Sequence, residues 1–191
     1  MKVVAFSGSA RKDGNTAVLL RGVLKVLEAE GFETELIQLS GERIRGCAAC
    51  RKCFENKDER CTINEDKVND YIQKMKEAEG ILLGSPTYFG MMSTEMKALI
   101  DRAGFVARAN PDILKYKVGA AVVAVRRAGG MSTFDAINHF FLINQMIVPG
   151  SSYWNIGIGH KKGEVANDNE GMETMEVLGK NMAWLIRKLK A

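Results

Sequence analysis

All four cysteines of the chain lie within one short stretch, residues 46–61, with the sequence GCAACRKCFENKDERC. They are Cys47, Cys50, Cys53 and Cys61, in the spacing C-x2-C-x2-C-x7-C. The two-residue gaps let three neighbouring thiolates turn toward one centre, and the longer gap lets a fourth sulfur close the cage from another side. Four thiolates are the ligand set of an iron–sulfur cluster or of a tetrahedral zinc ion. We therefore expect residues 46–61 to form a metal-binding loop.

Other uses of four cysteines have to be weighed against a [4Fe–4S] cluster. Disulfides are disfavoured because the chain shows no secretory segment and is large enough to fold without them. Zinc sites usually present two separated cysteine pairs, whereas three closely spaced cysteines with a distant fourth are typical of bacterial ferredoxins. Thr62 stands where a proline often follows the fourth ferredoxin cysteine. The spacing favours a [4Fe–4S] cluster, with zinc and metal-free thiols as the remaining alternatives.

The elements around this loop alternate between strand and helix patterns. Apolar or alternating runs predict strands at residues 2–6, 33–39, 80–84 and 117–126, and a fifth within 147–158 that Pro149 and Gly150 interrupt. Apolar residues at helical spacing predict helices from about residue 16 to 31, and near 64–78, 94–103, 132–145 and 172–190. Five strands alternating with five helices predict an α/β fold with a doubly wound parallel sheet. We expect residues 1–191 to form a single domain.

The loop after the first strand, SGSARKDGNT at residues 7–16, has the composition of an anion site. Backbone N–H groups at the start of the following helix favour a negative charge. Side-chain donors are available from Ser7, Ser9, Asn15 and Thr16, and a cation from Arg11. The loop is neither a Walker A motif nor G-x-G-x-x-G, and its hydroxyl-rich composition suits one terminal phosphate. The alternative is a surface turn in which Asn15 or Thr16 caps the helix.

Two further loops follow strands at the same predicted edge of the sheet. SPTYFGMMS, residues 85–93, offers Tyr88 and Phe89 to wall a flat ring, although aromatic residues at such a junction also serve as core. RAGG, residues 127–130, allows close backbone approach to a ligand, or forms a plain turn. The phosphate loop after the first strand favours the flavodoxin-like order 2-1-3-4-5, with the ligand at the switch point between strands one and three. A ligand with a phosphate at one end and a flat polar ring at the other fits the phosphate loop and the aromatic loop together, and FMN is the obvious candidate.

Composition excludes other classes of function. The 191 residues carry a formal charge of +4 and are 46% hydrophobic, as in an ordinary globular protein. Basic residues are scattered among acidic ones, so no nucleic-acid surface is expected. No apolar run approaches the roughly 20 residues needed to span a bilayer, so no membrane partner is expected. We expect a cytoplasmic protein, where thiols stay reduced and available for metal.

Three motifs in this order resemble the iron–sulfur flavoprotein family, within the wider group of NADPH-dependent FMN reductase-like flavodoxin folds. They are SGSxRxxGNT, C-x2-C-x2-C-x7-C and SPTYFG. The resemblance implies a [4Fe–4S] cluster on Cys47, Cys50, Cys53 and Cys61. It implies that FMN phosphate binds at Ser7, Ser9, Arg11, Asn15 and Thr16. It implies that the isoalloxazine ring contacts Pro86, Thr87, Tyr88, Phe89, Gly90 and Met91, and lies near Ala128, Gly129 and Gly130.

The function that follows is electron transfer by a flavin-dependent oxidoreductase, without a catalytic acid or base. The redox partner is expected to be a one-electron carrier such as ferredoxin, together with a second acceptor. The alternative is a cluster-free reductase in which NAD(P)H reduces the flavin, which then reduces free FMN or a quinone. The resemblance also implies a homodimer or homotetramer in which the cluster of one subunit lies near the flavin of another.

Overall fold

A computed structural model describes residues 1–111 and 113–191, and its centre is a five-stranded parallel sheet. The strands are β1 (Lys2–Ser7), β2 (Glu33–Gln38), β3 (Gly80–Pro86), β4 (Val118–Val125) and β5 (Ile156–Ile158). Their order is β2-β1-β3-β4-β5, and every pairing is parallel. The predicted flavodoxin-like doubly wound order 2-1-3-4-5 is therefore confirmed. The reversal of strand order between β1 and β3 creates the crevice at which such sheets bind ligands.

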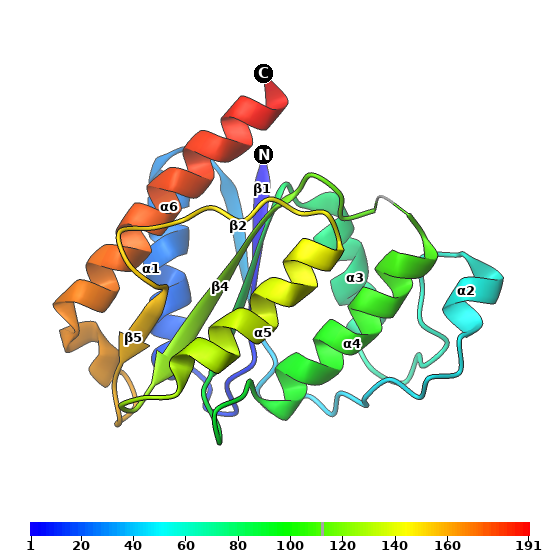
Figure 1. The fold of residues 1–191 in the computed structure, drawn as a ribbon, viewed down its shortest axis with the longest axis horizontal. Helices are drawn as coiled ribbons and strands as arrows, with labels where there is room; N and C mark the ends of the chain where they lie inside the picture. The colour runs from blue at the N-terminus through cyan, green and yellow to red at the C-terminus, as the bar shows by residue number, and fades with distance from the viewer. Residues whose placement is uncertain (112) are drawn as a thin grey trace.

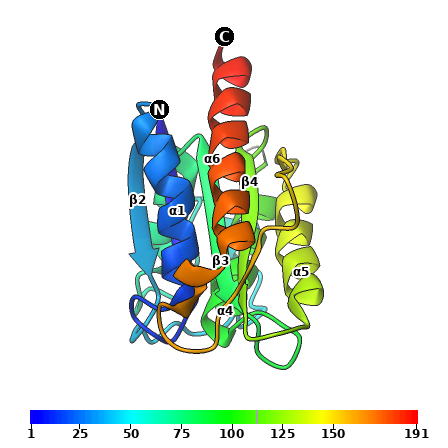
Figure 2. The same cartoon turned by 90° about the vertical axis from the view of Figure 1, so that its left-hand side faces the viewer.

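Helices cover both faces of the sheet, as Figures 1 and 2 show. One face carries α1 (Asn15–Ala29) and α6 (Asn169–Lys190), which pack against each other. The other face carries α3 (Val68–Glu77), α4 (Thr94–Ala109) and α5 (Gly130–Ile143). A short helix α2 (Lys52–Asn56) lies outside these layers in the cysteine loop, and a 3₁₀ turn η1 (Glu164–Asn167) precedes α6.

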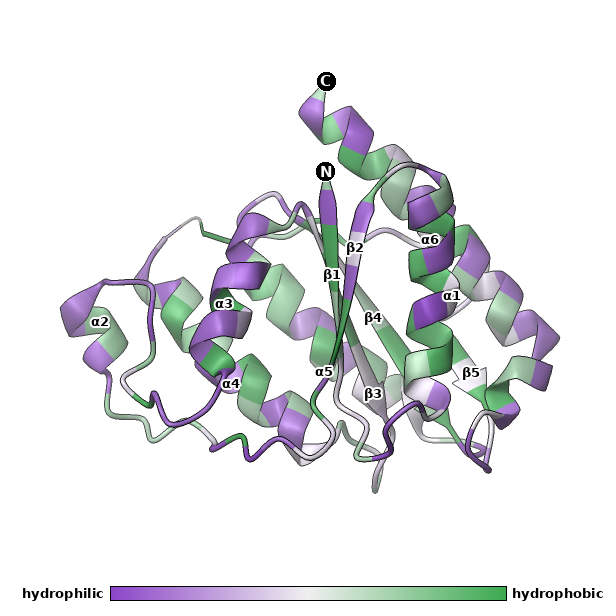
Figure 3. Cartoon of the chain, turned by 180° about the vertical axis from the view of Figure 1, so that it is seen from behind, coloured by the Kyte–Doolittle hydropathy of each residue, from purple (hydrophilic) through white to green (hydrophobic). Residues whose placement is uncertain are grey.

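Two apolar cores hold the layers together, one on each face of the sheet. All eight residues of β4 are buried, because a central parallel strand is covered by helices on both sides. Figure 3 shows the apolar central strands between helices whose outer faces are hydrophilic. Met175 and Met182 of α6 are fully buried in the core beneath α1, so the methionines at helical spacing serve packing there.

The fifth strand and the second predicted helix differ from the sequence-based expectation. Only Ile156–Ile158 pairs with β4 as a strand, while Ile147 makes a single parallel bridge to Val118 at the other end of β4. The predicted helix at 64–78 begins only at Val68, because the Asp66 carboxylate accepts the Val68 N–H and holds the preceding residues in a turn. Among the described residues, no helix is long and apolar enough to cross a bilayer.

Candidate functional site

The loops that follow β1 and β3 lie against each other at the carboxyl edge of the sheet. The Gly8 N–H donates to the Gly84 carbonyl at 2.8 Å, which continues the β1–β3 pairing beyond the strand. A Cβ atom on Gly8 would lie 2.7 Å from both Met96 Cβ and Ser93 Oγ at the start of α4. Only glycine fits this approach, so the first loop is held directly beside the one that follows β3.

Two buried hydroxyl groups at the ends of the β1–α1 loop have no hydrogen-bond partner among the described residues. They belong to Ser7 and Thr16, each 1% exposed. Gly14 is the N-cap of α1 and makes no side-chain cap, so neither Asn15 nor Thr16 caps the helix. The first helical N–H groups therefore lack a side-chain acceptor at the positive end of the helix dipole. Buried donors without partners are costly, so this loop is suited to receive an anion.

Two other predicted phosphate-site residues bind a distant segment of the chain. The Asn15 amide donates to the Gly159 carbonyl at 2.9 Å and accepts from the Val165 N–H at 3.4 Å. The Arg11 guanidinium donates to the His160 carbonyl at 3.3 Å. These contacts close one side of the loop with residues that precede α6. The Ser9 hydroxyl accepts the Arg11 N–H at 3.2 Å and so shapes the turn.

The loop after β3 forms a tight hairpin that presents an aromatic ring to solvent. Tyr88 and Met91 exchange backbone hydrogen bonds of 2.8 and 3.0 Å. Phe89 and Gly90 at the tip have φ values of 51° and 77°, the pattern of a type I′ turn. The Phe89 side chain is completely exposed, and Tyr88 is 44% exposed. A bulky residue in the left-handed region with no packing partner indicates a surface built to meet another molecule.

The loop after β4 lies beside this hairpin. Gly129 has a φ of 83° and is the N-cap residue of α5, and a Cβ atom there would lie 3.7 Å from Thr87 Cγ2 and 3.8 Å from Gly90 Cα. The Thr87 hydroxyl also donates to the Thr133 hydroxyl at 3.2 Å, which ties the two loops together. The predicted ring-binding residues, Pro86 to Met91 and Ala128 to Gly130, are thus neighbours at one edge of the sheet.

The four cysteines line a separate cavity of about 250 Å³, on the side of α4 that faces α2. All four are free thiols; Cys50 is exposed, and the other three are half-buried. Ala49 and Arg51, between the first three cysteines, have φ values of 50° and 59° and turn the backbone so that the thiols share one cavity. Among the described residues, no group of three or more His, Cys, Asp or Glu is arranged to hold a single metal ion.

The protein environment shifts the pKa values of two of these thiols in opposite directions. The pKa of Cys50 is lowered by a hydrogen bond from the Lys52 backbone and by the Thr62 hydroxyl, 3.5 Å from its sulfur. The pKa of Cys53 is raised, mainly by burial. A thiolate that accepts hydrogen bonds is the form that binds metal. These hydrogen bonds therefore favour the thiolate form of Cys50 relative to an unperturbed thiol.

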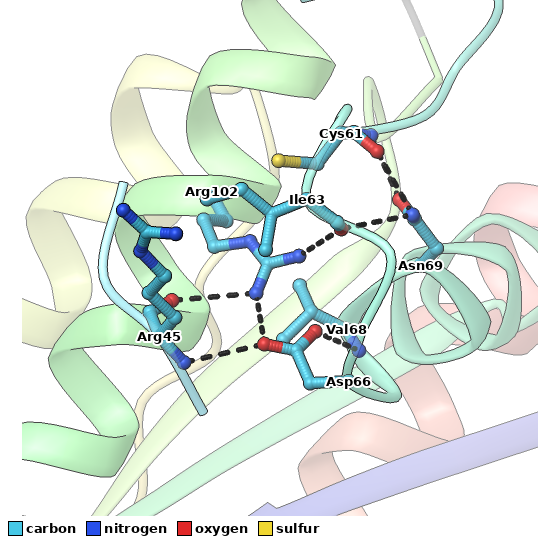
Figure 4. A network of polar contacts seen from close by, with 7 residues as sticks. All are labelled: Arg45, Cys61, Ile63, Asp66, Val68, Asn69 and Arg102. Carbon is cyan, nitrogen blue, oxygen red and sulfur yellow. Dashed lines mark hydrogen bonds and ion pairs between the residues drawn. The ribbon is translucent and has the colours of Figure 1, made fainter. Parts of the chain in front are cut away.

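A network of buried polar groups clamps both ends of the cysteine loop, as shown in Figure 4. Asn69 accepts the Cys61 N–H at 2.7 Å and donates back to the Cys61 carbonyl at 2.9 Å. Arg102 donates to the Ile63 carbonyl at 2.6 Å and to the Asp66 carboxylate. It also reaches the Arg45 carbonyl, just before the loop, at 3.3 Å.

Sequence reasoning missed this network, although a signal for it exists. Arg102 is a lone cation among the buried positions Leu99, Ala103 and Val106 of α4. A charged residue on an apolar helix face requires a partner, and here the partner is Asp66. Burial alone would lower the pKa of Arg102, but the interactions with Asp66 and Cys61 raise it, so the side chain stays charged.

An open apolar groove of about 630 Å³ connects the two regions across α4 and α5. Met91 of the hairpin and Phe54 of α2 both line this groove. Phe105 of α4 lines both this groove and the cysteine cavity and is 40% exposed. The groove is therefore a continuous surface from the hairpin to the cysteine loop.

The chain is similar to a family model, to relatives in sequence and to solved structures. A family model described as NADPH-dependent FMN reductase matches residues 1–161. An iron-sulfur flavoprotein of Methanocaldococcus jannaschii is 41% identical over the full length of both chains. One of Methanosarcina thermophila is 34% identical over 95% of this chain and 93% of its own.

Solved structures with low sequence identity share the fold. RosB, with bound 8-demethyl-8-formylriboflavin-5'-phosphate, has a TM-score of 0.80 at 16% identity, covering all of this chain and 80% of its own. A flavodoxin from the domain Archaea has a TM-score of 0.63 at 19% identity, covering 98% and 99%. The motifs, the sheet order and these matches agree. The chain belongs to the iron–sulfur flavoprotein family, within the NADPH-dependent FMN reductase group.

Proposed function

We propose that this flavin-dependent oxidoreductase holds FMN at the carboxyl edge of its sheet and a [4Fe–4S] cluster on Cys47, Cys50, Cys53 and Cys61. It passes electrons between a one-electron carrier such as ferredoxin and a second acceptor, in the cytoplasm. The observation that carries the proposal is the cavity of about 250 Å³ that all four cysteines line beside a flavodoxin-like fold. FMN exchanges two electrons and can release them singly, while a cluster handles one at a time, so together they connect two-electron and one-electron partners.

The β1–α1 loop fits the phosphate of FMN. The unpartnered hydroxyls of Ser7 and Thr16 and the uncapped start of α1 supply donors to an anion. Asn15 and Arg11 hold the 159–165 segment over the side of the loop. These contacts fix the positions of Asn15 and Arg11 beside the proposed phosphate site.

The hairpin and the loop after β4 fit a flat ring. Residues 86–91 supply the exposed faces of Tyr88 and Phe89, and residues 128–130 bring backbone within reach without a bulky side chain. Aromatic faces stack on a conjugated ring, and glycine permits N–H groups to approach its heteroatoms. These residues bind and orient the ring, and no acid or base is needed for electron transfer.

The cysteine cavity fits a thiolate-bound metal group in its donor chemistry. Four thiolates are the ligand set of a zinc ion or an iron–sulfur cluster, and three closely spaced cysteines with a distant fourth favour the cluster. Arg102 adds a buried Nε–H with no acceptor among the described residues. A fixed N–H donor beside the thiols favours sulfur atoms that accept a hydrogen bond.

We propose that a second copy of the chain covers the groove between α4 and α5. Exposed Phe105 and Ile143, 40% and 60% accessible, form an apolar surface of the kind that buries against a partner. Because the groove runs from the hairpin to the cysteine loop, pairing there brings the flavin region of one subunit toward the cluster loop of another. Sedimentation equilibrium of the holoprotein tests this proposal, and a monomer at micromolar concentration contradicts it.

The deciding measurement is iron and acid-labile sulfide per FMN in anaerobically purified protein, with an EPR spectrum after reduction. We expect four irons and four sulfides per FMN, and the [4Fe–4S] stoichiometry fails if either is absent. In a Cys50→Ser variant, we expect loss of the broad absorbance of the cluster with FMN retained, because Cys50 lies outside the flavin loops. Iron and sulfide retained in full by that variant would remove Cys50 from the ligand set.

The alternative is a cluster-free reductase that takes hydride from NAD(P)H. The family model described as NADPH-dependent FMN reductase favours it. Anaerobic addition of NADPH separates the two functions. Rapid bleaching of the flavin supports the reductase, whereas bleaching only by reduced ferredoxin supports the electron carrier.

A further inference from the structure

Arg102 is placed to do more than hold the cysteine loop in position. The residue is 1% exposed and lines the same cavity as the four cysteines. A guanidinium has five N–H donors. Its Nη atoms donate to Asp66, Ile63 and Arg45, which account for three of them. The Nε–H is buried and has no acceptor among the described residues.

The direction of this unused donor is set by the groups that fix the other nitrogens. Asp66 and the Ile63 and Arg45 carbonyls bind the Nη atoms from the side of the loop backbone. The guanidinium is planar, so these bonds also fix the direction of the Nε–H. Figure 4 shows the Cys61 sulfur on the side of the loop that faces Arg102. A buried donor is costly when it lacks an acceptor, and sulfur atoms held in the cavity would supply one.

We propose that Arg102 donates its Nε–H to the sulfur face of the cysteine cavity and thereby raises the reduction potential of the cluster held there. The inference rests on the proposed function, because it concerns the same four-cysteine site. Reduction adds negative charge to the cluster and its thiolates. A fixed hydrogen bond and a buried cation stabilise the reduced form more than the oxidised form. Asp66 offsets part of the cationic charge, so the directed Nε–H carries the effect.

The first test is an EPR-monitored redox titration of the anaerobic holoprotein and of Arg102→Lys. Lysine keeps the positive charge but cannot present a planar Nε–H while binding Asp66, Ile63 and Arg45. We expect the reduced-to-oxidised ratio of the cluster at a fixed potential to fall about tenfold, which is about 59 mV for one electron. The FMN midpoint should not move. Arg187→Lys, an exposed change near the end of α6 and outside both sites and the groove, is the matched control and should leave both midpoints unchanged.

The second test needs no change at Arg102. Holoprotein carrying guanidino-¹⁵N arginine is reduced, and pulsed EPR is used to detect a ¹⁵N coupling to the cluster. We expect a coupling that survives Arg51→Lys, because Arg51 is the other arginine lining the cavity. Wild-type protein without such a coupling overturns the proposal, even if Arg102→Lys fails to assemble a cluster.

The outcomes separate this inference from the function on which it rests. A residue with a structural role alone would change iron content or unfolding temperature and leave the midpoint of any assembled cluster unchanged. A cluster present in wild-type protein, with an unshifted midpoint in Arg102→Lys, overturns the inference and leaves the proposed function standing. Wild-type protein without iron and sulfide overturns both.

Discussion

The unpartnered hydroxyl of Thr16 predicts that one substitution has opposite effects on the apoprotein and on FMN binding. Thr16 is 1% exposed in the first turn of α1, and its hydroxyl has no partner among the described residues. Its methyl group lies 3.0 Å from where a Cβ on Gly84 would stand, so the side chain packs tightly against β3. Valine has the same shape and replaces only the hydroxyl. The Thr16→Val variant therefore removes a polar group and leaves the packing almost unchanged.

The size of each effect follows from the cost of burying a polar group. A buried hydroxyl without a partner costs about 1–3 kcal/mol, so the apoprotein of Thr16→Val should be more stable by up to that amount. In a chain of this length, each kcal/mol raises the unfolding temperature by about 2–4 °C. In the complex, the same hydroxyl donates to a charged phosphate. Losing a hydrogen bond worth about 1.5–3 kcal/mol should weaken FMN binding roughly 10- to 150-fold.

Calorimetry of the apoprotein and fluorescence titration with FMN measure the two effects separately. Thr174→Val is a matched control, because the Thr174 hydroxyl is buried but already donates to the Glu170 carbonyl at 2.8 Å. The control should lower or leave unchanged the stability of the apoprotein and should not alter FMN affinity. Unchanged FMN affinity in Thr16→Val, or a destabilised apoprotein, would refute the assignment of this hydroxyl to the phosphate.

Two further predictions concern the other packed parts of the site. Gly8→Ala places a Cβ 2.7 Å from Ser93 Oγ and should lower the free energy of unfolding in urea by about 1–3 kcal/mol. The control Gly150→Ala, whose Cβ would have nothing within 4 Å, should leave that free energy almost unchanged. Equal effects of the two substitutions would contradict the close approach at Gly8. Although burial raises it, the pKa of Asp66 is lowered by the Arg102 hydrogen bond. This carboxylate therefore contributes stability above its unfolded pKa of about 3.9, and the contribution is lost as pH falls through the lower folded value. Urea unfolding from pH 6 to 2 should show a fall below about pH 4 that is smaller in Asp66→Asn, and identical slopes would contradict it.

The order and type of the main elements were predictable from local patterns. Continuous apolar runs such as Lys2–Ser7 and Val118–Val125 are buried on both faces, and only a central parallel strand with helices on each side provides that environment. The apolar residues at helical spacing in α1 and α6 are those that the two helices bury in the core. The positions of the three strand-end loops followed, because parallel strands bring their carboxyl ends to one edge. The spacing of the cysteines predicted that they would face a common centre.

Several details of the site depend on residues that are far apart in the sequence. Asn15 does not cap α1, and its phosphate contact stays a prediction. Its amide holds Gly159 and Val165, whose proximity arises only once α6 packs on α1. The fifth strand is short, because the chain passes Val118 at the start of β4 with a single bridge from Ile147 and pairs with the end of β4 only at Ile156–Ile158.

The sequence by itself determined the chemistry available: four thiols in one loop, a hydroxyl-rich loop after the first strand, and a loop with two aromatic residues after the third. Those features are local, because neighbouring residues share one loop whatever the rest of the chain does. Only the tertiary structure decided that Arg102 is buried beside the cysteine cavity with Asp66 as its counter-ion, and that its Nε–H has no acceptor among the described residues. The pairing joins residues 36 positions apart. Its reason is energetic, since a charge becomes buried only where folding brings its partners together.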